Sequence, residues 1–176
     1  MLKLLMKKIT LQTIVLTACF LSFVNASAQD GNRNLGFGLQ SSFPTYGLSA
    51  KIGISDRLLA QAIVAPFNSV KSTDFGYSVN FFGARGNYRL SDPDASVVPF
   101  AFAGAGVIRS SLNFMGTKST TNYLGWSLGA GLEFFPGFLD NLSASAEIGY
   151  GSMNVSSVGV TVSGISLGIG VHYFVN

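Results

Sequence analysis

The feature that most constrains this chain is an alternation of large apolar side chains with small or polar ones, repeated eight times between residues 34 and 175. The clearest copy is 124–134, where Leu124, Trp126 and Leu128 alternate with glycine and serine. A period of two places one face of a β-strand in an apolar medium and the other against small or wet surroundings. We therefore expect an all-β fold, an eight-stranded antiparallel up-and-down transmembrane β-barrel. Its strands are expected at residues 34–41, 46–55, 58–67, 75–90, 97–112, 124–134, 142–151 and 160–175.

The N-terminus has the three parts of a secretory signal peptide. Three lysines form a basic start, residues 9–24 are apolar, and residues 26–28 read Ala-Ser-Ala, a small-residue cleavage motif. We expect residues 1–28 to be a cleaved signal peptide and residues 29–176 to form an outer-membrane β-barrel domain. One alternative remains open, because residues 16–19 resemble a lipobox ending at Cys19. Against it, the apolar run continues past Cys19, where lipoproteins usually become polar.

Charge and cysteine content exclude several functions for the expected mature chain. Three of the eleven Lys and Arg residues lie in the signal, whereas all eight Asp and Glu residues lie outside it, which leaves a net charge of zero. Nucleic acid is therefore not an expected partner. Cleavage after Ala28 would also remove the single cysteine, so that neither disulfides nor a thiolate metal site is expected. No cofactor or metal is expected.

The lengths of the connections predict an orientation. No mature segment has the roughly 20 apolar residues of a spanning helix, whereas a spanning strand needs only about 9–11. The connections after the second, fourth and sixth expected strands are compact, and those after the third, fifth and seventh are longer and polar, with 113–122 the longest. Bacterial outer-membrane barrels have short periplasmic turns and longer outer loops. Both termini are thus expected in the periplasm. The outer loops are interpreted as solvated surface, with contact to lipopolysaccharide as the alternative.

Aromatic side chains on the expected outward face should form two belts at the membrane interfaces, which amphipathic rings favour. The residues expected near the outer interface are Tyr46, Tyr77, Tyr123, Trp126 and Tyr150, and those near the periplasmic interface are Phe37, Tyr88, Phe100, Phe134 and Tyr173. Such belts indicate outer-membrane lipids as the surrounding partner.

Three segments, 83–90, 99–106 and 168–174, resemble the small outer-membrane β-barrel family, of the OmpA transmembrane-domain and OmpX type. The resemblance covers essentially the whole mature chain and implies a fold rather than an activity. The last segment is similar to the signal that the family presents to the outer-membrane assembly machinery, which ends in an aromatic residue. Here Val175 and Asn176 follow Phe174, a small departure from that pattern. We expect a monomer.

Charged residues on the expected inward face form a candidate network in the lumen. An eight-stranded barrel is just wide enough for side chains to fill it, and an unpaired charge there costs several kcal/mol. The cations and anions are therefore expected to form ion pairs that plug the barrel, with Gln61 and Asn80 as neighbouring polar residues. The alternative is that these pairs form a gate in a narrow pore. The residues of this network are Lys51, Arg85, Arg109, Glu133, Glu147 and His172.

Few residues of the sequence are suited to catalysis. His172 is the only histidine, and the Ser145–Glu147 pair on one strand face has no histidine placed to complete a triad. We expect no enzyme activity. Three functions follow in order of preference: a structural or surface-interaction protein of the outer membrane, a narrow gated pore for small solutes or ions, and a periplasmic lipocalin-like barrel that binds an apolar ligand.

Overall fold

The computed structural model describes residues 33–71, 75–139, 141–155 and 159–175. The expected signal peptide, the alternative lipobox and their cleavage site lie outside these residues. Within the described ranges, no helix is long and apolar enough to span a membrane.

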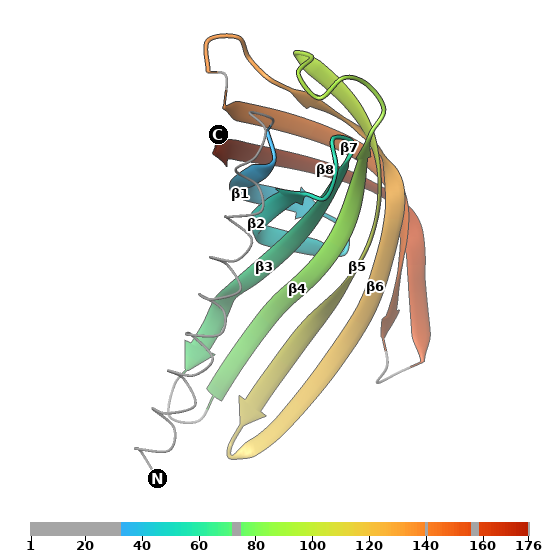
Figure 1. The fold of residues 1–176 in the computed structure, drawn as a ribbon. Coiled ribbons are helices and arrows are strands. Elements are labelled where there is room, and N and C mark those ends of the chain that lie inside the picture. The colour runs from blue at the N-terminus through green and yellow to red at the C-terminus, as the bar shows by residue number, and fades with distance from the viewer. Residues whose placement is uncertain (1–32, 72–74, 140, 156–158, 176) are drawn as a thin grey trace.

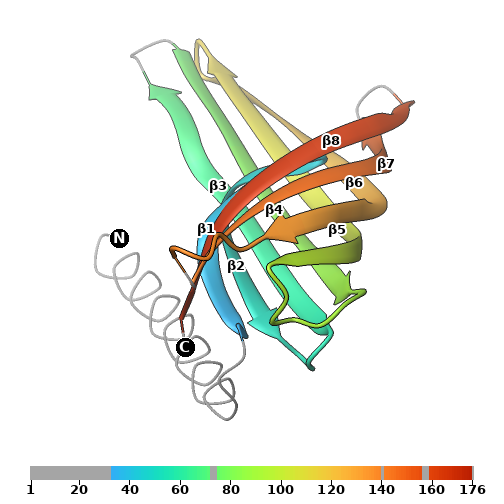
Figure 2. The ribbon, with the colours of Figure 1, turned by 90° about the horizontal axis from the view of Figure 1, so that it is seen from above.

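Eight antiparallel strands form a closed barrel in which each strand pairs with its neighbours in sequence and β1 pairs with β8 (Figures 1 and 2). This is the predicted fold. The strands are β1 (Leu35–Ser42), β2 (Thr45–Gly53), β3 (Leu58–Lys71), β4 (Phe75–Arg89), β5 (Val97–Phe114), β6 (Thr117–Phe134), β7 (Leu142–Val155) and β8 (Val160–Val175).

The register shows how strongly the strands tilt. Leu39 of β1 pairs with Val171 on one side. On the other side Leu39 pairs with Leu48 of β2, and the successive partners on β3 to β7 lead round the barrel to Thr161 of β8. Thr161 is ten residues away from Val171, and this offset is the stagger of the barrel. A stagger of this kind accompanies a strand tilt of roughly 35–45°. Residues at the same height along the barrel axis on neighbouring strands are therefore offset by slightly more than one position from the residues that pair in the register.

Both described ends of the chain, Arg33 and Val175, lie at one end of the barrel, together with connections 54–57, 90–96 and 135–141. We call this the proximal end. The distal connections that the structure describes, 43–44 and 115–116, are shorter than the proximal ones, so the predicted contrast between compact proximal and longer distal connections is not found there, and 113–122 is not a loop. Instead, β5 and β6 continue to a tight turn at Met115 and Gly116, both with positive φ, as a two-residue hairpin turn of type I′ requires. Of the polar residues read as loop, Asn113, Thr120 and Asn122 lie on the outward face of these two long strands, whereas Thr117, Ser119 and Thr121 are in phase with the lumen residue Glu133.

The barrel interior has three layers. Near the proximal end, an apolar cluster contains Leu59, Val98, Phe135 and Phe174. A second apolar cluster, Ala65, Val79 and Phe81, lies toward the distal end. Buried polar and charged side chains occupy the middle of the lumen. The described interior is thus polar at mid-height and closed above and below by apolar residues.

Strand β5 has the opposite facing from the one predicted. Phe100 and Phe102 are buried in the lumen, not directed outward, while small residues such as Ala103 lie outside. The lumen positions opposite are Gly131, beside the Phe100 ring, and Gly129, beside the Phe102 ring. Because these glycines have no side chains, the barrel can hold two phenyl rings that an ordinary strand would exclude.

Candidate functional site

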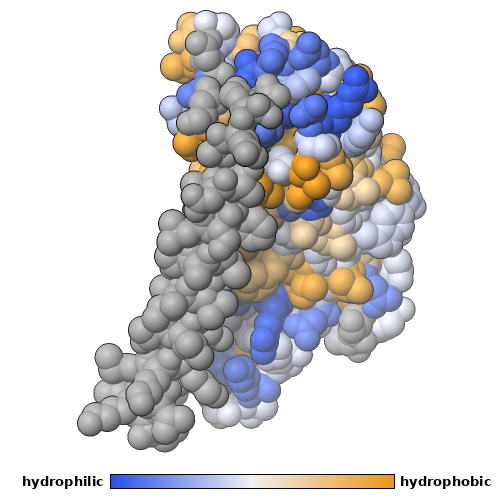
Figure 3. Space-filling model, viewed as in Figure 1, coloured by the Kyte–Doolittle hydropathy of each residue, from blue (hydrophilic) through white to orange (hydrophobic). Residues whose placement is uncertain are grey.

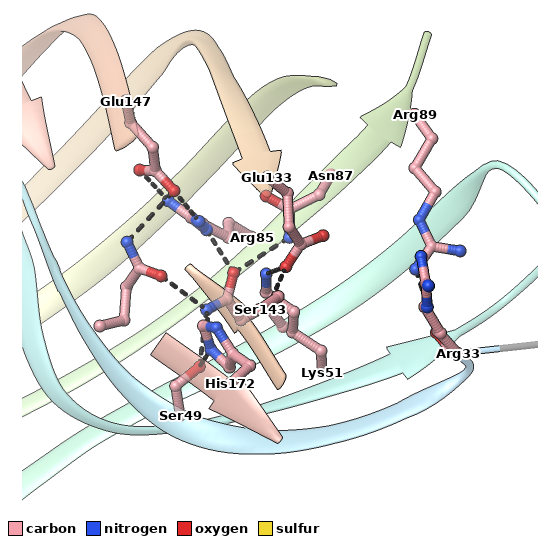
Figure 4. A network of polar contacts seen from close by, with 12 residues as sticks. Arg33, Ser49, Lys51, Arg85, Asn87, Arg89, Glu133, Ser143, Glu147 and His172 are labelled. Atoms are coloured by element: carbon pink, nitrogen blue, oxygen red, sulfur yellow. Dashed lines mark hydrogen bonds and ion pairs between the residues drawn. The ribbon is translucent and has the colours of Figure 1, made fainter. Parts of the chain in front are cut away.

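The structure brings five of the six expected lumen residues together: Lys51, Arg85, Glu133, Glu147 and His172 are all buried inside the barrel (Figure 4). They come from five different strands, and the period of two aims each of them inward. Arg109 does not join them, because the facing of β5 places it on the outer surface, where it is exposed. Asn80, expected as polar company, also lies on the outward face of its strand.

Arg85 and Glu147 form the central ion pair. The Arg85 Nη1 donates to Glu147 Oε2 at 2.7 Å, and Nη2 donates to Glu147 Oε1. The guanidinium also lies 4.9 Å from the centre of the Phe102 ring, which provides a cation–π contact. The pair is bidentate and has an aromatic wall, a geometry that holds both charges in one orientation.

Lys51 and Glu133 form a second ion pair nearer the proximal end. The Lys51 Nζ lies 2.7 Å from Glu133 Oε1, and Ser143 Oγ donates to the same oxygen at 2.8 Å. The Lys51 ammonium also lies 6.0 Å from the centre of the Phe174 ring, part of the proximal apolar cluster. This pair therefore rests directly on the apolar layer that closes the lumen.

Amides join the central pair to the histidine. Gln61 accepts from Arg85 Nε at 2.6 Å and donates to Ser49 Oγ at 2.6 Å. Ser49 Oγ in turn lies 2.9 Å from His172 Nε2. Gln40 donates to Glu147 Oε1 at 3.1 Å, which continues the chain of contacts to β1. Gln61 was predicted to lie here, whereas Gln40 and Ser49 were missed although their spacing on the inward faces of β1 and β2 was a usable signal.

Two arginines at the proximal end were also missed. Arg89 is almost completely buried and donates to the carbonyl oxygen of Arg33 at 3.0 Å. The guanidinium of Arg33 lies 3.7 Å from the centre of the Phe135 ring and donates to the carbonyl of Pro93. These contacts hold the proximal connections over the apolar cluster and set them apart from the central network, as Figure 4 shows.

The contacts of the network join strands that are distant in sequence. Within the described residues, no group of three or more His, Cys, Asp or Glu side chains could hold a metal ion. The hydrogen bonds that His172 makes there are with Ser49 and Gln61, and neither partner is a carboxylate. The Arg85–Glu147 pair, for example, links β4 with β7. The arrangement fills and braces the barrel.

Seven of the ten predicted belt aromatics lie on the outward face. Six are exposed and Phe37 is partly buried; Trp126 and Tyr150 lie side by side with ring centres 6.2 Å apart. The outward set is Phe37, Tyr46, Tyr88, Trp126, Phe134, Tyr150 and Tyr173. The strand tilt brings Tyr46, Trp126 and Tyr150 close to one level. In Figure 3, apolar side chains gather in a band across the middle of the visible face, with hydrophilic residues toward both ends.

The other three aromatics correct the prediction. Phe100 lies in the lumen, and Tyr77 and Tyr123 lie on the inward faces of β4 and β6, in phase with Arg85 and Glu133. Distal to the aromatic band the alternation reverses its polarity, so that apolar residues there mark the inner face. An outer apolar face around a polar lumen is also the reverse of the lipocalin-like alternative.

The comparisons with known proteins agree with this architecture. Residues 16–173 match the family model described as outer membrane protein beta-barrel domain. The N-terminal β-barrel domain of Pseudomonas aeruginosa OprF is similar in fold, with a TM-score of 0.53 and 16% identity over 79% of this chain and 93% of that one. Neisserial surface protein A has a TM-score of 0.51 and 19% identity over 80% of this chain and 93% of its own. No curated protein matches the chain.

Proposed function

The chain belongs to the outer membrane protein β-barrel domain family, and from this premise we propose that it is a structural or surface-interaction protein whose lumen is closed and which carries no catalysis. It is a small outer-membrane β-barrel protein. We assign the distal end to the outside, because the strands there continue past the apolar band with a polar outer face, in the place where such barrels carry their larger extracellular part. The proximal end, with both described ends of the chain, then lies in the periplasm.

The observation that carries the proposal is the sealed lumen. The Arg85–Glu147 pair crosses the barrel at mid-height, the Lys51–Glu133 pair lies nearer the periplasm, and both are almost fully buried. Phe174 belongs to the apolar layer beneath them, so that a hydrated ion would have to displace both charge pairs and this layer to pass. The network supports a plug better than a gate.

The outer surface supplies the contacts that the proposal requires. Outward residues between the two aromatic levels are apolar and suit lipid, whereas Arg109 and Lys118 are exposed beyond the distal level. Arg109, close to the aromatic level, can contact anionic groups of the outer leaflet, including the phosphates of lipopolysaccharide, and Lys118 extends the same charge toward the tip of the β5–β6 hairpin. Strands pair on both sides throughout the apolar band, which supports a monomer in the membrane.

The test is ion conductance in planar bilayers. The folded protein, verified by heat-modifiable migration in detergent gels, is expected to produce no discrete conductance steps. The variant Glu147→Ala/Arg85→Ala removes the central plug and serves as a control for insertion. Steady conductance from the unaltered protein, abolished or enlarged by Glu133→Gln, would instead support the narrow-pore function.

A further inference from the structure

The strands extend beyond the outer aromatic level and form a partial wall that we call the crown, residues 75–81, 108–114, 117–123, 151–155 and 159–164. Its outward face is polar: Ser111 meets Thr120 at 3.1 Å, and Asn154 donates to Thr161 at 3.4 Å. The last outward apolar residues before this change are Phe82, Val107, Leu124, Tyr150 and Ile165. The crown therefore rises out of the apolar band of the barrel.

The inward face of the crown is uncharged and mostly apolar, and part of it is exposed. Register places Tyr77 opposite Leu112, both in phase with the lumen residues of their strands. Leu112, Phe114 and Val162 are 41%, 54% and 54% exposed. Across the described crown, inward positions carry no charged side chain. The polar ones are Ser110, Thr117, Ser119 and Thr121, and the apolar and aromatic ones include Tyr77, Val79, Phe81, Ile108, Leu112, Phe114, Tyr123, Met153, Val155, Val160 and Val162. Apolar surface left open to water in this way marks an interaction site.

The crown has an opening on one side. Strands β1 and β2 have only 8 and 9 residues, against 18 in β5 and in β6. The β1–β8 register ends at Ser41 and Ile169, and the β2–β3 register ends at Leu48 and Val64. Distal to the tip of this short β1–β2 hairpin, no strand of the described chain lies between β3 and β8. The wall thus has a lateral notch at the outer edge of the apolar band.

A groove lies at the foot of the notch, between the β1–β2 hairpin and β8, and one of its residues contacts the inner face of the crown. It has a volume of about 390 Å³ and is lined by Leu39, Tyr46, Gly47, Ile169, Gly170 and Val171 together with Gln40 and Ser41. The Tyr46 ring in this groove lies 4.2 Å, centre to centre, from the ring of Phe81, whose side chain is on the inner face. One aromatic contact therefore bridges the two apolar surfaces.

We propose that the crown binds the hydrocarbon chain of an outer-leaflet lipid, which enters laterally through the notch. The uncharged inner face suits a hydrocarbon and offers no partner to an ionised headgroup, which would stay outside near the notch. Continuity with the lipid-facing groove makes the membrane the source of the chain. A second copy does not fit, because the outward crown face it would present is polar. The inference does not depend on whether the lumen is closed.

The experiment is photolabelling in nanodiscs of dimyristoylphosphatidylcholine that contain a phosphatidylcholine with a diazirine at the end of one acyl chain. Trypsin releases residues 110–118 as one peptide, because Arg109 and Lys118 are its cleavage sites. This peptide carries Leu112 and Phe114 and is expected to be labelled. Leu112→Asp should lower its labelling about tenfold, since loss of one buried leucine contact corresponds to roughly one decade in binding.

Ser111→Asp is the matched control, because Ser111 is the neighbouring residue on the opposite face of β5; its labelling should equal that of the unaltered protein. Gly164→Trp is a second test, since nothing lies within 4 Å of the Cβ position at Gly164 and a large side chain there starts from open space on the inner face of the crown. It should also reduce labelling. Labelling confined to peptides of the apolar band, equal losses in both aspartate variants, or cross-linked dimers would each overturn the proposal.

Discussion

Replacing Glu147 by glutamine tests whether the central ion pair is truly removed from water. The side chains of Arg85 and Glu147 are 4% and 1% exposed. Two unit charges about 4 Å apart attract by about 4 kcal/mol at an effective dielectric constant of about 20. Glutamine keeps the shape but turns an amide N–H₂ toward the guanidinium, so that one of the two charge-assisted bonds is lost. We expect the free energy of unfolding to fall by about 3–5 kcal/mol, as for other broken buried pairs.

The assay is equilibrium urea unfolding in lipid vesicles, followed by the fluorescence of Trp126. The double variant Arg85→Met/Glu147→Leu should regain most of the lost stability, because it removes both charges and fills the space with apolar atoms. Arg109→Met is the control, since this exposed arginine should change stability by no more than about 0.5 kcal/mol. A loss below about 1 kcal/mol for Glu147→Gln, the range of exposed pairs, would refute the desolvated network.

Three further outcomes are expected. Gly47→Ala should destabilise the barrel by about 1–3 kcal/mol in the same unfolding assay, because Gly47 has a φ of +142° and a Cβ there would lie 2.3 Å from the carbonyl oxygen of Val64; Gly86→Ala, with nothing within 4 Å, should not. Phe102→Ala should cost about 3–5 kcal/mol through the cavity it leaves in the lumen, and an unchanged unfolding midpoint would contradict that packing. Trp126, the only tryptophan, should be quenched by brominated lipid and not by aqueous iodide.

The sequence was sufficient to predict the strand segments that lie within the membrane, where the outer face of the barrel contacts lipid. There, outward positions must be apolar, so that the period of two fixes which residues point inward, and Arg85, Glu133 and Glu147 were correctly placed in the lumen. The mutual pairing of these charges follows from the cost of an isolated charge in so narrow a space. Gln40 and Ser49 could have been added by the same argument, since both lie in phase with the inward face.

Two errors have different physical causes. In β5 both faces are apolar, and only the glycines of β6 and β7, which come close in space, determine that Phe102 points inward. In the crown, the outward medium changes from lipid to water, so the same alternation continues with its polarity reversed. A prediction that takes apolar residues as outward throughout therefore reads 113–122 as a loop and places Tyr77 and Tyr123 on the wrong face, although both are in phase with inward residues of their strands. The misplacement of Arg109 follows from the inverted facing of β5.

The short β1–β2 hairpin also has a mechanical consequence. The hairpin pairs with only the proximal parts of its longer neighbours, Ile169–Val175 of β8 and Leu59–Val64 of β3, whereas β5 and β6 are paired over their whole length. A pulling force applied at the N-terminus loads the β1–β8 seam first and peels the hairpin away as one unit. The remaining six strands would resist as an open sheet, so that a force–extension curve should show one small early rupture followed by larger ones.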